Sequence, residues 1–427
     1  MSLHKTAPPL RIAVWHNLPS GGGKRALWHH VRGLVQCGHQ VTAFCPESAA
    51  GGYLPLDSLC TVHALPLPAN KKPFAPRFLR WWAEARLAAA RIASHRAHAQ
   101  LVAAQIAQGH FDVLFANSCT EFAVPAIGRY VPLPRVLYLG EPRRQFYEAQ
   151  PDLLFLAPKP AAGAATCGIK ALSNSGKALF ATRLLMREER DNAALFDRIL
   201  CNSAFSRESI LRAFGIESEV CLLGIDSDRF QPVFDEAKAI AGPFVIGLGA
   251  IQPHKGIDRA ILAVAALPAN LRPRLLWIGN DEGAAYRTAM EQLAANQQVA
   301  LQFRTQVTDF ELVRCLSSAL ALLYTSRLEP FGLAPLEANA CGTPVIAIAE
   351  GGVRESLIDG ENGLLVADAK PQTIAAALLR LLQEPALLQA LRSQCRAAVV
   401  DRFSLAAADA RLVAALRSTI AAASKAR

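Results

Sequence analysis

Short apolar runs alternate along the chain with glycine-rich loops and with longer stretches in which apolar residues recur at helical spacing. The first cycle has an apolar run at residues 10–15, three consecutive glycines at 21–23, a helical pattern at 26–36 and a second apolar run at 41–44. A strand, a glycine loop, a helix and a second strand make a βαβ unit. The pattern therefore predicts that the chain opens with a doubly wound α/β domain on a parallel sheet.

The same pattern predicts strands and helices downstream. Apolar runs that we interpret as strands lie at residues 111–115, 136–139, 198–203, 244–249, 275–279, 299–303 and 344–349. Residues 150–178 are rich in Ala, Pro, Gly and Ser with weak periodicity, which predicts a mobile loop. Because 427 residues are too many for one ordinary core, we expect two domains.

Composition supports a folded protein and narrows its chemistry. Hydrophobic residues make up 52% of the chain and charged residues 19%, which argues against a disordered chain. The ten cysteines are dispersed and none forms a C-x-x-C pair, so neither a zinc site nor a redox motif is indicated, and a reducing compartment is expected. The N-terminus lacks the apolar core of a signal peptide, and no apolar run approaches the roughly 20 residues that span a bilayer. We therefore expect a soluble or peripheral protein.

The positive charge is confined to the first half of the chain. The net charge is +10, from 45 Lys and Arg against 35 Asp and Glu. Residues 1–222 hold 25 of the basic and 15 of the acidic residues, which leaves 20 of each for residues 223–427. This asymmetry predicts an anionic partner for the first half, either a membrane surface or an acidic acceptor.

Basic and aromatic residues are interleaved between residues 71 and 108. The basic residues are Lys71, Lys72, Arg77, Arg80, Arg86, Arg91 and Arg96, and the apolar ones among them are Phe74, Phe78, Leu79, Trp81, Trp82 and Leu87. On a helix, this mixture is what an interfacial membrane-binding segment requires. An ordinary amphipathic surface helix is the alternative, because arginine stems also pack well on apolar surface.

The second half of the chain contains two glutamates, Glu329 and Glu337, with seven residues between them. That spacing cannot place both carboxylates on one helical face. If Glu329 lies in a loop and a helix starts near Pro335, both carboxylates can line one pocket, and the free N–H groups of the helix would suit an anionic ligand such as a diphosphate. The alternative is that Glu329 caps a turn and Glu337 is a solvated helix residue.

The segment from residue 327 to residue 363 resembles the donor-site signature of retaining glycosyltransferases of family four (glycosyl transferases group 1). The pattern is E-x7-E with FG after the first glutamate, then A-x-G-x-P-V-I, G-G-x-x-E and D-G-x-x-G. The matching residues are Glu329, Phe331, Gly332, Glu337, Ala340, Gly342, Pro344, Val345, Ile346, Gly351, Gly352, Glu355, Asp359, Gly360 and Gly363. The resemblance implies the GT-B fold, in which two Rossmann-like domains with doubly wound parallel sheets face a central cleft.

The resemblance extends toward both ends of the chain. The glycine loop is similar to the family's G-G-x-E-R element, with Lys24 where glutamate is common, and implies that the amides of Gly22 and Gly23 approach the donor phosphate; a tight structural turn is the alternative. Segment 221–230 is similar to the family's N-G-V-D…F element, so we place the domain boundary at Gly224. Residues 1–224 would then bind the acceptor and residues 225–427 the nucleotide-sugar donor. A C-terminal helix at about 405–424 is expected to cross back to the first domain.

In the donor half, one functional position departs from the family pattern. Family members carry an arginine and a lysine in the loop after the strand at 244–249, where they clamp the donor diphosphate. Lys255 is present here, but Ala250 occupies the arginine position. Gly279 and Val307 match positions near the nucleotide base and phosphate in the family.

In the acceptor half, the departure is at Gly140, where a histidine often follows the strand in this family. The next residue is Glu141, which we expect to act as a catalytic base or as an acceptor contact. Arg143 or Arg144 would then bind an anionic group of the acceptor. A salt-bridged loop carboxylate at Glu141 is the alternative.

The resemblance implies transfer of a sugar from a nucleotide-diphosphate donor to an acceptor hydroxyl, with retained anomeric configuration, no metal and no cofactor besides the donor. Lys255, the amides of residues 331–333 (Phe331, Gly332 and Leu333) and the helix near Pro335 would stabilise the leaving diphosphate, which is electrostatic work. Glu337 would accept hydrogen bonds from the donor ribose, and Glu329 would contact and orient the transferred sugar. Lys255, Glu329 and Glu141 are thus the expected catalytic residues.

Expected partners are the nucleotide-sugar donor, a glycan or lipid-linked acceptor and, through residues 71–96, an anionic membrane surface, but no nucleic acid. The implied setting is cell-envelope polysaccharide, lipopolysaccharide or glycolipid synthesis in the cytoplasm, at the inner face of the cytoplasmic membrane. The departures at Ala250 and Gly140 leave a non-catalytic nucleotide-sugar-binding protein, derived from a transferase, as the alternative. An NAD-dependent oxidoreductase is disfavoured because neither glycine loop has G-x-G-x-x-G spacing.

Overall fold

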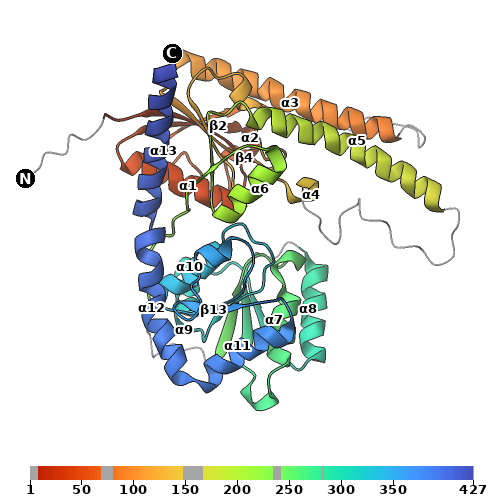
Figure 1. Ribbon diagram of the computed structural model, residues 1–427, viewed down its shortest axis with the longest axis vertical. Coiled ribbons are helices and arrows are strands. Elements are labelled where there is room, and N and C mark those ends of the chain that lie inside the picture. Colours follow the sequence, from red (N-terminus) through yellow and green to blue (C-terminus); the bar gives the residue numbers. More distant parts are fainter. Residues whose placement is uncertain (1–7, 69–79, 148–166, 234–241, 281–282, 427) are drawn as a thin grey trace, which may run out of the picture. The chain divides into compact units, whose positions relative to one another are not determined.

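The computed structural model describes residues 8–68, 80–147, 167–233, 242–280 and 283–426. The chain divides into two compact units (Figure 1). The first unit comprises Met1–Asn202, Ser206–Leu222 and Asp409–Arg427, and the second comprises Ser203–Phe205 and Leu223–Ala408. The main change of unit thus falls between Leu222 and Leu223, beside the predicted boundary at Gly224.

The first unit is built on a seven-stranded parallel sheet with the strand order β3-β2-β1-β4-β5-β6-β7. The strands are β1 Arg11–Asn17, β2 Gln40–Pro46, β3 Thr61–Leu65, β4 Val113–Cys119, β5 Arg135–Tyr138, β6 Arg198–Cys201 and β7 Glu219–Val220. The helices are α1 Gly21–Gln36, α2 Glu47–Ala50, α3 Arg80–Gln108, η2 Ala126–Arg129, α4 Arg144–Tyr147, α5 Cys167–Ala193 and α6 Ala204–Phe214.

The central strands of this sheet are buried on both faces, whereas the edge strand β3 is partly exposed. Ile12, Ala13 and Val14 of β1 are all fully buried. Because parallel crossovers are right-handed, the helices before and after the reversal at β1 and β4 cover opposite faces of the sheet. Strands covered in this way are continuous apolar runs rather than alternating ones, which is why β1 can be predicted from its sequence.

The second unit repeats this plan with a six-stranded parallel sheet in the order β10-β9-β8-β11-β12-β13. The strands are β8 Phe244–Leu248, β9 Arg274–Ile278, β10 Leu301–Arg304, β11 Leu322–Tyr324, β12 Val345–Ile348 and β13 Gly363–Val366. The helices are η4 Pro253–Lys255, α7 Ile257–Ala265, η5 Ala269–Leu271, α8 Ala284–Asn296, α9 Asp309–Ser318, α10 Leu333–Ala340, η6 Gly351–Glu355, α11 Pro371–Gln383 and α12 Pro385–Phe403.

The chain ends in helix α13, Leu405–Ala426, most of which belongs to the first unit. Arg411 of this helix donates a hydrogen bond to the Leu222 carbonyl at 3.2 Å, and Arg417 donates one to the Pro8 carbonyl at 2.9 Å. The Asp409 carboxylate lies against Gly33 of α1, where a Cβ atom would come within 1.9 Å of Oδ1. Glycine at position 33 is therefore what allows α13 to approach α1 this closely.

Some predicted elements are wrong in extent, and two cannot be assessed. Helix α5 occupies residues 167–193, so the loop predicted for residues 150–178 is wrong over its last twelve residues. The glycines at 21–23 form the first turn of α1 instead of a loop before it. Residues 150–166 of the predicted loop and residues 71–79 of the predicted membrane segment lie outside the described residues.

In the described part of the chain, no single helix has the length and apolar composition to cross a bilayer. The pair α11 and α12 meets both requirements only when taken together, and it is bent by 98°.

Candidate functional site

The sheet of the second unit provides one edge where loops from neighbouring strands converge. β8 is the first strand in sequence and pairs with β9 on one side and with β11 on the other. In doubly wound sheets, ligands bind beyond the carboxyl ends of the strands at this reversal point. The loops that follow β8 and β11 carry Lys255 and Glu329, and the loop after β12 carries Gly351 and Gly352. The topology therefore brings together the residues on which the predicted donor site depends.

Lys255 and Glu329 form an ion pair across this reversal point. The Nζ atom of Lys255 lies 3.1 Å from Oε1 and 3.0 Å from Oε2 of Glu329. The two side chains retain 19% and 25% of their exposure, so both can be reached by a ligand. Glu329 thus holds the partly exposed ammonium group where a phosphate could contact it.

Backbone contacts fix the loop that carries Lys255 against the end of β11. The Thr325 hydroxyl lies 3.0 Å from the Lys255 carbonyl and 2.8 Å from the Gly256 carbonyl. Arg259 of α7 donates to the Thr325 carbonyl at 3.0 Å. Gly256 has φ of +72°, and a Cβ atom there would lie 2.5 Å from the Thr325 carbonyl oxygen. The position of Lys255 therefore depends on a glycine and on contacts between two loops.

The loop after β12 packs closely against the backbone of Glu329 and Pro330. Gly351 has φ of +65°, and a Cβ atom there would lie 2.4 Å from the Glu329 carbonyl oxygen. Gly352 donates its N–H to the same carbonyl at 2.8 Å, and its own Cβ would lie 2.0 Å from the Pro330 carbonyl oxygen. Glycine is thus required at positions 351 and 352 because the two loops approach each other closely. The contact fixes the backbone of Glu329.

Helix α10 begins directly after the loop that follows β11 and directs the amides of its first turn to the same edge of the sheet. Gly332, at φ of +93°, is the N-cap residue and makes no side-chain cap, so the N–H groups of the first turn have no side-chain partner from that residue. Phe331 is 3% exposed and its ring packs against Phe403 at 6.0 Å between centroids. Phe331 can therefore serve a site only through its backbone, and the donor contact expected of the amides of residues 331–333 stays a prediction.

Glu337 lies inside the protein rather than on a solvated helix face. It is 2% exposed, one turn into α10 and eight residues after Glu329. The alternative in which Glu337 is a solvated helix residue is therefore wrong. A carboxylate at this depth is retained only where its oxygens accept hydrogen bonds.

Two further predicted donor contacts lie along the same edge of the sheet. Gly279 follows β9, and a Cβ atom on it would lie 1.8 Å from the Gly249 carbonyl oxygen. Close packing of two loops thus explains this glycine without a ligand. Val307 follows β10, the outermost strand, in a turn where Gln306 adopts φ of +54° and Thr308 caps α9.

The reversal point of the first sheet carries buried polar groups at the carboxyl ends of β1 and β4. Asn17 donates to the Cys119 sulfur at 3.2 Å, and His16 is 1% exposed. Burial, with a smaller effect of Lys24, lowers the pKa of His16 to about 3, so its ring is neutral at physiological pH. Gly22 and Gly23 lie in the first turn of α1, which follows β1.

Lys24, which stands where glutamate is common in the resembled family, is a core residue here. Its side chain is fully buried, and Nζ donates to the Ala49 carbonyl at 3.3 Å. Burial lowers its pKa. This substitution is therefore accommodated inside the first unit and does not place a cation at the surface.

The predicted acceptor residues each have partners within the first unit. Glu141 accepts a hydrogen bond from Arg144 at 2.7 Å, which is the salt-bridged loop carboxylate that we considered as the alternative. Arg143 donates to the Thr120 carbonyl, and its Nε lies 3.7 Å from the carboxylate of Glu189. The three side chains keep between 20% and 41% of their exposure, so an acceptor group could still reach them.

Gly140 lies close to one neighbouring side chain. A Cβ atom on it would lie 3.3 Å from Nδ2 of Asn202, a close contact that would require Asn202 to move. The glycine that replaces the expected histidine is therefore matched to its surroundings.

Several polar contacts at these sites were not predicted. Thr325 and Arg259 shape the lysine loop, and the pairing of Arg327 with Glu350 at 2.5 Å holds the next loop. Thr325 directly follows β11, a strand that was not recognised in the sequence, so its role was not apparent there. In the described part of the chain, no three His, Cys, Asp or Glu side chains are grouped so that they could hold a metal ion.

Almost the whole chain matches two protein families. Residues 228–398 match the family described as Glycosyl transferases group 1, and residues 21–225 match the family described as Glycosyl transferase 4-like domain. Among curated proteins, D-inositol 3-phosphate glycosyltransferases are similar. The one from Streptomyces bingchenggensis is 34% identical over 50% of this chain and 50% of its own length, and the one from Frankia alni is 32% identical over 46% and 53%. The chain thus spans about half the length of the curated relatives it matches.

Solved structures share the fold at low sequence identity. A sucrose-phosphate synthase from Thermosynechococcus elongatus superposes with a TM-score of 0.69 at 21% identity, over 97% of this chain and 100% of its own. The Anabaena protein HepE in complex with UDP superposes with a TM-score of 0.67 at 18% identity, over 96% of this chain and 100% of its own. A glycosyltransferase from Rickettsia africae gives a TM-score of 0.69 at 16% identity, over 97% and 99%.

Proposed function

Because the chain belongs to the glycosyl transferases group 1 family and has the GT-B fold, we propose that it transfers a sugar from a nucleoside-diphosphate sugar to an acceptor hydroxyl. The observation that carries this proposal is the Lys255–Glu329 pair beside the first turn of α10, at the reversal point of the second sheet. A cation and free helix amides at one place are what a departing diphosphate requires.

The donor would be held by charge and by backbone amides. Lys255 would leave part of its contact with Glu329 to bind the diphosphate, and the amides of residues 331–333 would bind the other phosphate oxygens. The buried Glu337 would accept hydrogen bonds from the ribose hydroxyls. Glu329, released from full pairing with the lysine, would contact the transferred sugar. The HepE structures in complex with UDP and with UDP-glucose support a uridine or related nucleotide as the donor.

We assign the reaction as retaining and independent of a metal ion. In this assignment the acceptor oxygen attacks the anomeric carbon on the face from which the diphosphate leaves, through an ion-pair-like state. Lys255 and the α10 amides supply the positive potential that the leaving group needs, so the proposed chemistry assigns no step to a cation or a cofactor. The family resemblance of the segment from 327 to 363 supports this assignment.

The proposed acceptor rests on the names of the curated relatives and on three residues of the first unit. The curated relatives are named for D-inositol 3-phosphate, which is a hydroxyl acceptor that carries a phosphate. Arg143, Arg144 and Glu141 of the first unit remain the proposed acceptor contacts. We place the reaction in the synthesis of a cell-envelope polysaccharide, lipopolysaccharide or glycolipid, with a glycan or lipid-linked acceptor.

We also propose that the protein is cytoplasmic and associates with the inner face of the cytoplasmic membrane. The net charge of +10 and the exposed Arg86 and Arg91 on α3 support an anionic surface as partner. Arg96, in contrast, is engaged by Glu188 through two hydrogen bonds of 3.0 and 2.5 Å, so it would take no part in such contact.

The donor site can be tested by the thermal stability of the protein with nucleotides. Because a ligand stabilises the folded state by an amount that grows with the logarithm of its concentration over Kd, the true donor should raise Tm. UDP, GDP and ADP, with their glucose conjugates, are the probes. The variant Glu337→Gln should lose most of the shift, whereas the control Glu384→Gln, at a surface carboxylate of the same unit, should keep it. Equal shifts in both variants, or no shift with any nucleotide, would remove the proposed donor site.

The alternative function is a transferase-derived protein that binds a nucleotide sugar without turning it over. The observation in its favour is that Ala250 and Gly140 replace two expected functional residues. Slow release of UDP from the bound donor in the absence of acceptor, measured with a coupled assay, distinguishes the two functions. A transferase should hydrolyse its donor slowly, and a binding protein should not hydrolyse it at all.

A further inference from the structure

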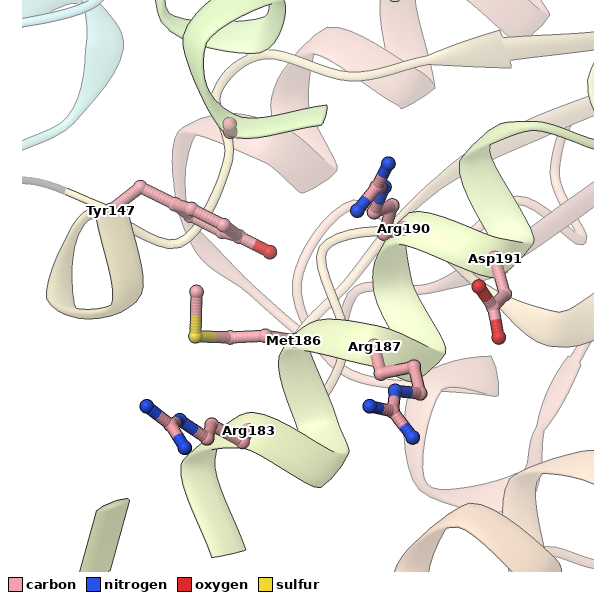
Figure 2. A pocket seen from close by; sticks show the side chains of 7 residues that line it. Tyr147, Arg183, Met186, Arg187, Arg190 and Asp191 are labelled. Atoms are coloured by element: carbon pink, nitrogen blue, oxygen red, sulfur yellow. The ribbon is translucent and has the colours of Figure 1, made fainter. Parts of the chain in front are cut away.

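A cavity of about 470 Å³ lies in the first unit between helices α4, α5 and α6 (Figure 2). Helix α5 provides Arg183, Met186, Arg187, Arg190 and Asp191 to its lining. Helix α4 provides Tyr147, and α6 provides Ala213. We call this cavity the arginine pocket. Its lining residues all belong to the first unit, whereas the proposed donor residues Lys255, Glu329 and Glu337 belong to the second unit.

The three arginines of the pocket lie on one face of their helix. Residues 183, 187 and 190 are spaced by four and three positions, which places their side chains in one row. One carboxylate, Asp191, accompanies them, so the lining has two more positive than negative groups. In the part of the chain that the structure describes, no side chain forms a hydrogen bond or an ion pair with any of the three guanidinium groups. The pocket therefore has an unbalanced positive charge.

Other polar residues of α5 differ from the three arginines because they have partners within the protein. Glu188 is bound by Arg96 and lies 3.6 Å from Arg129, and Asn192 accepts a hydrogen bond from Arg129 at 2.5 Å. Glu188 and Asn192, on the face of α5 that packs against α3 and η2, are thus satisfied by the protein. The arginine row of the same helix is exposed and has no such partner among the described residues, so its guanidinium groups are available to a ligand.

The remaining wall of the pocket is apolar and includes one unused hydroxyl. Figure 2 shows the Tyr147 side chain extending from α4 toward α5, between Arg190 on one side and Met186 and Arg183 on the other. Its ring packs edge-on against Phe214 at 5.4 Å between centroids, which fixes its orientation. The hydroxyl is buried and has no hydrogen-bond partner among the described residues. Burial, with a smaller effect of the Glu189 carboxylate, raises the pKa of Tyr147, so the hydroxyl keeps its proton and can donate it to an acceptor oxygen.

We propose that the arginine pocket binds an organic phosphate. Planar guanidinium groups bind phosphate oxygens through two parallel hydrogen bonds, which a row of arginines can offer more than once. The Tyr147 hydroxyl adds a further donor, and the Tyr147 ring with Met186 and Ala213 contacts the carbon skeleton next to the phosphate. The volume of the pocket is in the range of about 300–1,000 Å³ that is typical of small-molecule sites, which is far larger than one phosphate ion needs.

This chemistry could come from a soluble phosphate ester or from the headgroup of an anionic phospholipid. The first arm of the test is calorimetric titration with phenyl phosphate, with inorganic phosphate for comparison. The second arm is co-sedimentation with vesicles of phosphatidylcholine that contain or lack about one-third phosphatidylglycerol. Binding in either arm that depends on the arginine row supports the proposal and identifies the source of the phosphate.

The double variant Arg183→Ala/Arg187→Ala should weaken binding by at least about ten-fold, as expected for the loss of charge-assisted hydrogen bonds. The matched control is Arg207→Ala, an exposed arginine of α6 outside the pocket, which should bind like the wild type. Tyr147→Phe keeps the ring and should weaken phenyl phosphate binding by a few-fold. Arg183→Lys/Arg187→Lys keeps the charge, so binding between that of the wild type and that of the alanine variant would show that the guanidinium geometry contributes.

Two measurements keep this proposal separate from the proposed transferase function. Circular dichroism and nucleotide-induced shifts of Tm should be unchanged in the arginine variants, because the altered side chains lie at the surface of the other unit. Lys255→Ala should leave phenyl phosphate binding unchanged. The proposal is wrong if phenyl phosphate and anionic vesicles both fail to bind, or if they bind the double variant as well as they bind the wild type.

Discussion

The two units place their polar groups by different means. At the reversal point of the second sheet, short loops that follow β8, β11 and β12 hold each other through backbone contacts and glycines. Lys255 and Glu329 are the side chains that this arrangement presents, and they pair with one another. Because the geometry depends on residue types at fixed spacings, the site leaves a dense motif in the sequence.

In the first unit, long helices place the polar groups, and the contacts join residues far apart in the chain. Arg96 of α3 meets Glu188 of α5, which lies 92 positions later, and Glu189 accepts the Ala123 amide, 66 positions earlier. Helix surfaces can exchange such pairs without changing any loop, so no short motif marks them. The site of the second unit is thus specified mainly by backbone geometry, and the polar groups of the first unit by side-chain contacts between helices.

The largest effect expected is on turnover when Lys255 is replaced. Lys255→Ala removes the positive charge that would stabilise the leaving diphosphate, and removal of one such group typically costs about 10²–10³-fold in kcat. The control is Lys370→Ala, a lysine of the same unit that is paired with Asp368 and 75% exposed. Donor turnover measured by nucleotide release should fall in the first variant only. Equal turnover in both would show that the Lys255–Glu329 pair is structural.

Gly279 tests whether backbone geometry specifies the second unit. Gly279→Ala would place a methyl group 1.8 Å from the Gly249 carbonyl oxygen, so the two loops must separate. We expect a loss of about 3 kcal/mol in the free energy of unfolding, at the upper end of overpacking effects. The control is Gly283→Ala, because a Cβ there would meet nothing within 4 Å. Urea denaturation of both variants provides the measurement, and similar midpoints would contradict the packing argument.

Glu189 tests the side-chain contacts of the first unit through pH. Burial raises its pKa from 4.5 to about 7, against the weaker opposing effects of the Ala123 amide and Arg143. A raised native pKa means that this carboxyl favours folding fully below pH 4.5 and loses that contribution as pH rises through 7. Glu189→Gln stays neutral, so relative to the wild type it should gain about 2–3 kcal/mol between pH 5 and pH 8.

Thermal melts of the wild type and of Glu189→Gln at pH 5, 6, 7 and 8 measure this effect. Glu208→Gln is the control, since Glu208 pairs with Arg212 on the surface and is 54% exposed. Its difference from the wild type should not vary over the same range. A constant difference for Glu189→Gln as well would mean that the carboxyl is ionised throughout, with Arg143 as its effective partner.

The same contrast explains what could be predicted from the sequence. The apolar runs of β1, β8 and β12 predicted parallel strands, and the resemblance of the segment from 327 to 363 predicted a donor loop followed by the helix α10. β11 was missed because it has only three residues, and the start of α5 was missed because its small residues have no clear helical period.

The burial of charged groups was harder to predict than the elements that carry them. Glu337 could be singled out because it lies in a motif, although its burial could not be deduced from its neighbours in sequence. Glu189 and the arginine row of α5 have no motif, because their environment is formed by Tyr147, Ala123 and Arg143 from other parts of the chain. Charged residues on a long helix look alike in sequence whether they face solvent, a cavity or another helix.

The smallest expected effect on stability is at Gly22. This position tests whether a glycine is needed for packing or for a ligand. Unlike Gly279, it lies in the first turn of α1 where a Cβ atom would meet nothing within 4 Å. Gly22→Ala should therefore raise the free energy of unfolding slightly, by about 0.5–1 kcal/mol, because alanine restricts the unfolded chain. Gly51→Ala is the control, a second glycine of the first unit with open space around it. If both variants are at least as stable as the wild type and only Gly22→Ala loses turnover, the glycine serves the donor and not the fold.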